Sequence, residues 1–181
     1  MSRGINYDER FDLVETKRGQ KVYLGYNFIM TRKNSSYVSY AHVKEALSNF
    51  KGLIEDHYFG SVNMNRPVGK CACVEITDEN KDKVQMLYRR GKSGKTPVII
   101  NGKMKQTQYI TLGIQRDKKD KEKYHVFAAY YGPCSMNEPW DPRIESEEQR
   151  KECEEFWSTH ALCLAPTQID WKRSKEQEET V

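Results

Sequence analysis

The sequence of 181 residues predicts an α+β protein with a mostly antiparallel sheet of five to six strands and three helices packed on it. Three observations lead to this prediction. Segments rich in β-branched and aromatic residues, which favour strands, alternate with segments whose apolar residues recur every three or four positions, which favour helices. Two strand-like segments are joined by Asn101-Gly102, a typical hairpin turn. Two more are joined by the charged turn 117–123, so an all-parallel sheet is excluded.

Five segments have the composition of strands. Residues 20–30 and 71–76 are short and rich in β-branched and aromatic residues or cysteine. Residues 96–100 and 103–116 are the two arms expected for the hairpin. Residues 124–131 are so apolar that we expect them in the middle of the sheet.

Three segments have the pattern of helices. The first follows Ser39, a typical N-cap, and is expected to run for about four turns. Its apolar stripe consists of Tyr40, Val43, Leu47, Phe50 and Ile54. A short helix is expected after Asp78, carrying Val84, Leu87 and Tyr88. A third begins at Ser146, which with Gln149 fits a capping box, and is expected to end at His160.

The pattern predicts one folded domain. Residues 1–19 are expected to form an N-terminal arm, residues 20–171 a single α+β domain, and residues 172–181 a charged tail. A compact chain of this length buries about 70% of the surface that its unfolded form exposes. We therefore expect it to fold without a disulfide or a metal.

Several classes of protein are excluded by composition. The first eight residues are polar, and no apolar stretch approaches the length of a membrane helix, so we expect a cytoplasmic protein with no membrane partner. The five cysteines are odd in number and lack the spacing of a disulfide framework. Cys71 and Cys73 lie two residues apart, but no further pair completes the four ligands of a structural zinc site. We expect no metal and no cofactor.

Residues 91–96 read Gly-Lys-Ser-Gly-Lys-Thr, which invites comparison with a phosphate-binding loop. The comparison fails because the glycine required five residues earlier is replaced by Met86 or Arg89. The predicted order of helix, loop and strand is also the reverse of the order that such a loop requires. Nucleotide hydrolysis is therefore not expected.

Positive charge is concentrated in the middle of the chain. Residues 81–123 hold 13 Lys/Arg against 4 Asp/Glu, net +9, whereas residues 124–181 hold 6 against 12, net −6. The leading hypothesis is a non-catalytic module that binds RNA or another polyanion. The predicted ligand-binding cations are Arg89, Arg90, Lys92, Lys95, Lys103 and Lys105, with further charge from residues 116–123. The alternative explanation is that these lysines only keep the protein soluble and its sheet edges unpaired.

An enzyme is the second hypothesis, a small hydrolase or transferase with its site at the loop 132–141. Cys134 and Asp141 lie in this loop, and His125 and His160 flank it. A cysteine and a histidine oriented by a carboxylate form a nucleophilic site, and two histidines can act as acid and base. The alternative is that these residues are structural, since a histidine near a helix C-terminus is favourable through the helix dipole alone.

A protein–protein adaptor is the third hypothesis. Trp140 lies between Pro139 and Pro142, in a segment that favours surface display of the ring, and an acidic helix follows. Trp140 is therefore also a candidate ligand-binding residue, although tryptophans pack in cores more often than they bind ligands.

The last third of the chain resembles a single-domain family of unknown function. The resemblance rests on Ala128-Ala129-Tyr130-Tyr131-Gly132-Pro133, then Glu138-Pro139-Trp140-Asp141-Pro142, then Phe156-Trp157 and His160-Ala161-Leu162. The chain departs from the family at the turn, where it has Tyr-Gly-Pro in place of Tyr-Pro-Gly. The resemblance implies no activity, cofactor or catalytic residue. It implies only that residues 130–162 form the functional surface.

Overall fold

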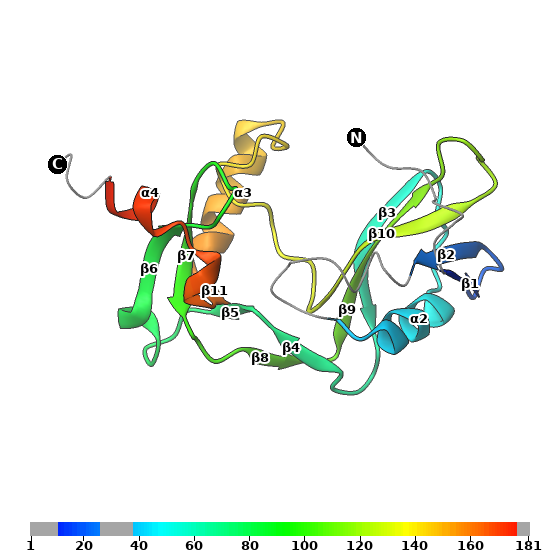
Figure 1. Cartoon of the computed structure of the whole chain (residues 1–181), viewed down its shortest axis with the longest axis horizontal. Coiled ribbons are helices and arrows are strands. Elements are labelled where there is room, and N and C mark those ends of the chain that lie inside the picture. Colours follow the sequence, from blue (N-terminus) through cyan, green and yellow to red (C-terminus); the bar gives the residue numbers. More distant parts are fainter. Residues whose placement is uncertain (1–10, 26–37, 177–181) are drawn as a thin grey trace. The chain divides into compact units, whose positions relative to one another are not determined.

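The computed structural model describes residues 11–25 and 38–176, which contain three helices and eleven strands (Figure 1). The α+β class is confirmed, and most strand pairs are antiparallel, as predicted. The strands lie in sheets of five, four and two, rather than in the single sheet of five to six that the sequence predicts.

The chain forms two compact units that alternate along the sequence. Unit 1 comprises Met1–Lys70 and Gln106–Cys134, and unit 2 comprises Cys71–Lys105 and Ser135–Val181. Strands β4 (Gly69–Cys71) and β8 (Lys105–Thr107) pair as a two-stranded sheet where the chain passes from one unit to the other. The single domain over residues 20–171 stays a prediction.

Unit 1 is built on the five-stranded sheet, in the order β1-β2-β10-β9-β3. Its strands are β1 (Phe11–Glu15), β2 (Lys21–Gly25), β3 (His57–Asn63), β9 (Tyr109–Arg116) and β10 (Tyr124–Tyr131). Strand β10 lies between β2 and β9, so its predicted position in the middle of a sheet is confirmed. The part of the predicted strand 20–30 beyond Gly25 lies outside the described residues.

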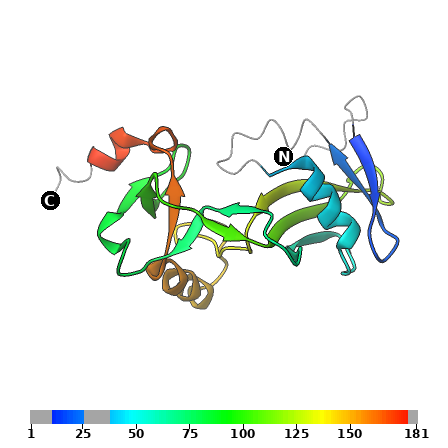
Figure 2. The same cartoon turned by 90° about the horizontal axis from the view of Figure 1, so that it is seen from below.

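Helix α2 (Tyr40–Asn49) covers one face of this sheet (Figure 2). Its buried residues Val43, Ala46 and Leu47 pack in one apolar core with residues of β2, β9 and β10. The helix is shorter than predicted, because the backbone becomes extended at Phe50. Phe50 and Ile54 are nevertheless buried in the same core, so the apolar pattern predicted burial more accurately than helix length.

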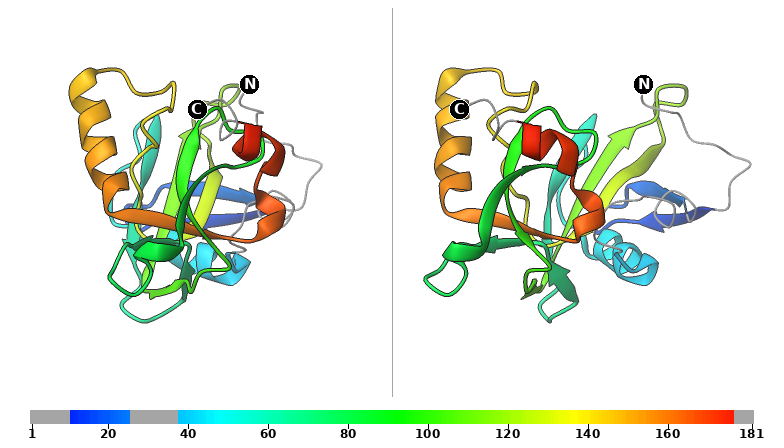
Figure 3. Two further views of the ribbon diagram at one scale, coloured as in Figure 1. Left: turned by 90° about the vertical axis from the view of Figure 1, so that its left-hand side faces the viewer. Right: turned by 60° about the vertical axis from the view of Figure 1, so that its left-hand side comes forward.

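Unit 2 contains the four-stranded sheet, in the order β5-β11-β7-β6 (Figure 3). Its strands are β5 (Cys73–Glu75), β6 (Val84–Tyr88), β7 (Lys95–Ile100) and β11 (His160–Leu164), and its helices are α3 (Glu147–Ser158) and α4 (Trp171–Glu176). One apolar cluster contains Val74, Ile99, Ala161 and Cys163, and another contains Leu87, Val98, Leu164 and Ile169. Adjacent residues of β7, Val98 and Ile99, belong to different clusters, so the two clusters lie on opposite faces of the sheet.

Helix α3 begins as predicted, since the Ser146 hydroxyl accepts a hydrogen bond from the Gln149 N–H. Its C-terminus differs from the prediction, because His160 is the first residue of β11. Helix α4 takes in residues 172–176, which the sequence places in the charged tail. No helix in the described part of the chain is both long and apolar enough to cross a lipid bilayer.

The helix predicted after Asp78 is wrong. A single 3-10 turn (Lys81–Lys83) is followed by strand β6. Val84, Leu87 and Tyr88 have helical spacing, but β6 pairs with β7 along its whole length. Pairing and burial in a sheet override a weak local pattern of three apolar residues.

The hairpin predicted at Asn101-Gly102 is also wrong, and the turn that forms is centred one residue earlier, on Ile100 and Asn101. Asn101 has a φ of 52°, and the Gly102 N–H donates to the Ile99 carbonyl at 3.2 Å. Strand β7 pairs with β6 and β11, however, whereas β9 pairs with β10 and β3. The chain therefore passes from one unit to the other after this turn. Strand β3 lies in a part of the chain to which the sequence analysis assigns no strand.

The core of unit 1 should be sensitive to loss of volume under α2. Leu47 is 0% exposed, so Leu47→Ala should lower the free energy of unfolding by about 2–5 kcal/mol, measured by urea titration. Lys44→Ala on the exposed side of the same helix should lower it by less than about 1 kcal/mol. Equal losses in the two variants would contradict the described packing of α2.

Candidate functional site

A turn rich in cations, residues 89–95, connects β6 to β7 in unit 2. Backbone hydrogen bonds join its start to a segment far away in the sequence. The Arg90 N–H donates to the Gln168 carbonyl at 3.0 Å, and the Asp170 N–H donates to the Tyr88 carbonyl at 2.8 Å. The turn therefore lies beside the segment that leads into α4, which is red in Figure 3.

Cations of α4 and of the turn meet around Tyr88. The Arg173 guanidinium lies 4.1 Å from the centre of the Tyr88 ring, and its Nη1 donates to the Lys92 carbonyl at 2.6 Å. The Lys95 ammonium lies 5.8 Å from the same ring centre. Attraction between a cation and an aromatic ring offsets part of the repulsion between these two charges.

We call the cations of this region the basic surface. It consists of Arg90, Lys92 and Lys95 from the turn and Lys172, Arg173 and Lys175 from α4. No ion pair within the described residues involves any of the six. Four of them are exposed, and Lys95 and Arg173 are half-buried. The region therefore presents positive charge to solvent without a direct ion pair in the described residues, and Lys92 lies near enough to Asp141 to help Arg143 lower the pKa of that carboxyl.

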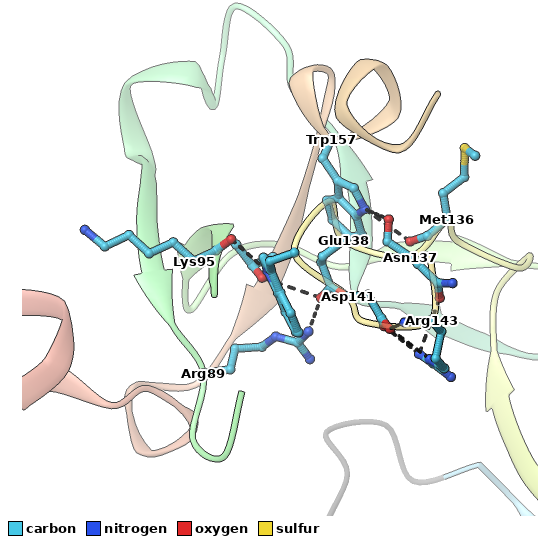
Figure 4. Close-up of polar contacts among 10 residues, drawn as sticks. Arg89, Lys95, Met136, Asn137, Glu138, Asp141, Arg143 and Trp157 are labelled. Atoms are coloured by element: carbon cyan, nitrogen blue, oxygen red, sulfur yellow. Dashed lines mark hydrogen bonds and ion pairs between the residues drawn. The ribbon is translucent and has the colours of Figure 1, made fainter. Parts of the chain in front are cut away.

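Arg89 has a different environment from the other predicted cations. Its guanidinium forms an ion pair with Glu138 in which the two side chains are only 23% and 13% exposed (Figure 4). The Arg89 Nε is buried and has no hydrogen-bond partner in the described structure. A charge that is paired and largely buried does not attract a ligand, so Arg89 joins the segment around Glu138 to the turn.

Trp140 packs on the same turn. Its indole N–H donates to the Lys95 carbonyl at 3.0 Å. A Cβ atom at Gly94 would lie 2.1 Å from Trp140 Cγ, so only glycine allows the ring to approach the backbone here. Trp140 and Glu138 thus hold the turn from one side, and α4 holds it from the other.

The rest of this segment is fixed by further hydrogen bonds (Figure 4). The Trp157 indole N–H is shared between the carbonyls of Met136 and Asn137, each at 3.1 Å. The Asp141 carboxylate accepts hydrogen bonds from the Arg143 side chain and main chain. The side-chain hydrogen bond from Arg143 holds the pKa of Asp141 below its usual value. Asp141 is therefore an ionised, buried carboxylate engaged by Arg143.

The four candidate catalytic residues are divided between the units, with Cys134 and His125 in unit 1 and Asp141 and His160 in unit 2. The Cys134 thiol is exposed and lies 3.5 Å from the Ser61 hydroxyl and 3.6 Å from the Thr111 hydroxyl. Within the described residues, the thiol is thus in contact with hydroxyls rather than with an imidazole.

The two histidines have local partners. His125 Nε2 lies 2.9 Å from the Gln115 amide nitrogen, and its Nδ1 is buried without a partner in the described structure. Burial lowers the pKa of His125, against the opposing charge of Asp117. His160 stacks on Phe156 at 4.0 Å, with its Nδ1 2.9 Å from the Phe156 carbonyl oxygen. A catalytic role for any of the four stays a prediction.

The remaining predicted cations lie elsewhere. Lys103 and Lys105 follow the C-terminal end of β7, whereas Lys95 is its first residue. A strand of this length spans about 20 Å, so these two lysines are separated from the basic surface. The turn 117–123 joins β9 to β10 in unit 1. The structure therefore brings together three of the six predicted binding cations, Arg90, Lys92 and Lys95.

The sequence analysis missed the part of the basic surface that α4 contributes. Residues 172–175 looked like the start of a solvated tail because charged residues dominate the sequence from there on. A signal was present in Ile169 and Trp171, two apolar residues beside the charged run, which pack in the core of unit 2.

The cysteines of unit 2 are not arranged as a metal site. No group of three or more His, Cys, Asp or Glu side chains within residues 11–25 and 38–176 is placed to hold a metal ion. Burial, together with Cys71, Cys163 and Glu138 nearby, raises the pKa of Cys73 to about 12. The Cys73 thiol is therefore protonated at neutral pH.

Comparison with known proteins gives a distant structural likeness. No protein-family model matches the chain, and no curated protein matches it. Among solved structures, it is similar to a conserved hypothetical protein from Toxoplasma gondii ME49, with 12% identity and a TM-score of 0.49 over 69% of this chain and 83% of that chain. These comparisons place the chain in no family. They assign no activity.

Removing the charge of Glu138 should destabilise unit 2. Glu138→Gln leaves the largely buried Arg89 guanidinium without its counter-ion, so the free energy of unfolding should fall by about 3 kcal/mol in a urea titration. Glu147→Gln is the matched control, because the Arg150–Glu147 pair is exposed and should contribute less than about 1 kcal/mol. A control variant as unstable as Glu138→Gln would contradict this assignment.

The cysteines should differ in reactivity. Cys134 is exposed, whereas Cys153 is 1% exposed and burial raises the pKa of Cys163. Under native conditions iodoacetamide should therefore label Cys134 first, as followed by mass spectrometry of tryptic peptides. Labelling of Cys153 or Cys163 at the same rate as Cys134 would show that these two thiols are not buried as described.

Proposed function

We propose that this protein is a non-catalytic binding module for a phosphate-rich partner, with RNA as the expected ligand. The observation that carries the proposal is the basic surface, six cations from two distant segments with no carboxylate partner in the described residues. Cations placed close together repel one another, and a bound polyanion relieves that repulsion while it releases its own counterions.

The arrangement of the basic surface supports a binding role over a purely solubilising one. A lysine that only solubilises a turn needs no fixed position. Here the Arg173 guanidinium is held by the Lys92 carbonyl and the Tyr88 ring, and Arg90 Nε donates to the Thr167 carbonyl at 2.8 Å. Guanidinium groups that are fixed before binding lose less conformational entropy when they contact phosphate.

Charge reversal at the basic surface should weaken binding at every ionic strength. Lys92→Glu and Arg173→Glu should each raise the Kd for mixed RNA about tenfold or more at ~50 mM salt, measured by filter binding. Each should also reduce the slope of log Kd against log salt by about 0.7 per lost phosphate contact.

The control is Lys151→Glu. Lys151 is exposed on α3, and this variant changes the net charge of the protein by the same amount. It should leave the Kd within about twofold of wild type, because Lys151 belongs to neither segment of the basic surface and therefore makes none of the proposed phosphate contacts. No retention of RNA by the wild-type protein at ~50 mM salt would end the proposal, because that condition favours phosphate contacts.

A further inference from the structure

The face of the unit 1 sheet opposite α2 is lined by aromatic and imidazole rings. Strand register defines this face, because His125 pairs with both Tyr23 and Gln115, Gln115 pairs with His57, and paired residues point to the same side. This face carries the rings of Tyr23, His57, Phe59, His125, Phe127 and Tyr130. We call it the aromatic face.

A β-bulge and a glycine create the centre of the aromatic face. The pairing of β10 with β9 shifts register between Val126 and Ala128, which makes Phe127 the extra residue of the bulge. A Cβ atom at Gly113 would lie 2.7 Å from Phe127 Cζ. The absence of a side chain at Gly113 therefore lets the Phe127 ring lie over the neighbouring strand β9.

The rings around Phe127 form a continuous row. The centre of the Phe127 ring lies 5.4 Å from that of His57 and 6.3 Å from that of Phe59, in both cases with the planes 30° apart. The Phe59 ring in turn lies 6.3 Å from the Tyr130 ring. The row thus crosses from the edge strand β3 to β10 near the middle of the sheet.

Two members of this row are exposed to solvent, and Phe127 and Tyr130 are half-buried. Phe59 is 45% exposed, and His57 beside it is also exposed. Among the described residues of unit 1, α2 is the one helix, and its apolar residues pack on the other side of the sheet. Exposed aromatic rings in a contiguous group indicate a binding surface more often than isolated exposed residues do.

Lysines border the aromatic face at the turn 117–123. Lys118, Lys119 and Lys121 are exposed there, and the Lys123 ammonium, which also forms an ion pair with Asp120, lies 5.6 Å from the centre of the Tyr23 ring. The Asp117 side chain is turned inward, where it accepts hydrogen bonds from the N–H groups of Lys119 and Asp120 and fixes the turn.

We infer that the aromatic face stacks the unpaired bases of single-stranded RNA, with the lysines of the turn 117–123 on the adjoining phosphates; this inference rests on the proposed binding of a polyanion. Every base has a π-face that an exposed ring can stack on, whereas a duplex hides those faces inside its helix. The rings can stack on the bases of a single strand, and the bordering cations can contact its phosphates. An apolar protein partner would match the rings alone.

The inference predicts a preference between two forms of the same ligand. Single-stranded RNA of about 12 nucleotides, the span of one binding face, should bind more tightly than the duplex of the same sequence or inorganic polyphosphate. Phe59→Ala should raise the Kd for the single strand about 5- to 150-fold, the loss of one stacked base, and leave the other two affinities unchanged. Fluorescence anisotropy with labelled RNA and competition by polyphosphate measure all three.

Two controls separate stacking from folding and from general apolar contact. Phe59→Trp keeps an exposed ring and should retain the preference for the single strand. Leu53→Ala removes an apolar side chain that is 56% exposed in the same unit, outside the described pairing of the sheet, and should change no affinity. Thermal melts of all three variants should coincide with wild type.

The outcomes also separate this inference from the proposed function. Equal affinity of the wild-type protein for single strand and duplex, or an unchanged Kd in Phe59→Ala, overturns the aromatic face as a base-binding surface. The basic surface then still stands if Lys92→Glu weakens binding of all three ligands. If none of the three ligands binds, the proposed function fails, and this inference fails with it.

Discussion

Backbone hydrogen bonds between residues 88–90 and residues 168–170 hold the cationic turn 89–95 beside the start of helix α4, which carries Lys172, Arg173 and Lys175. Left to electrostatics, the cations of the turn and of α4 would move apart. They are kept together by apolar and polar contacts, since Ile169 is 0% exposed and the Ser174 hydroxyl accepts a hydrogen bond from the Tyr88 N–H at 3.0 Å. Part of this charge is structural, since Arg173 packs on the Tyr88 ring and donates to the Lys92 carbonyl. The exposed remainder is the part proposed to bind a ligand of opposite charge.

The segment around Glu138 and Trp140 supports the same turn from its other side. Of these two residues, Trp140 was predicted from the sequence to bind a ligand through a surface-exposed ring. In the structure, Glu138 neutralises Arg89 and Trp140 packs against Gly94, so both shape the turn. The residues expected to contact a ligand are their neighbours Arg90 and Lys92, whose side chains are exposed. Glu138 and Trp140 thus support the turn, whereas Arg90 and Lys92 are the residues proposed to contact the ligand.

The sequence correctly predicted features that depend on local composition. The apolar run of β10, the buried stripe of α2 and the N-cap Ser146 are of this kind. What it missed depends on pairing between distant segments. Strand β6 looks helical until β7 pairs with it, and the hairpin at Asn101-Gly102 fails because β7 and β9 belong to different sheets. The same limit applies to the basic surface: Arg90, Lys92 and Lys95 could be named from a local charge run, whereas Arg173 joins them only through long-range pairing.

A footprint of lysine reactivity tests directly whether the basic surface contacts a polyanion. The protein would be acetylated briefly with and without saturating RNA, and each lysine quantified by mass spectrometry. We predict that RNA protects Lys92, Lys172 and Lys175, while Lys81 and Lys151 react equally in both samples. Protection of all lysines to the same extent, or of none in the basic surface, would contradict the account.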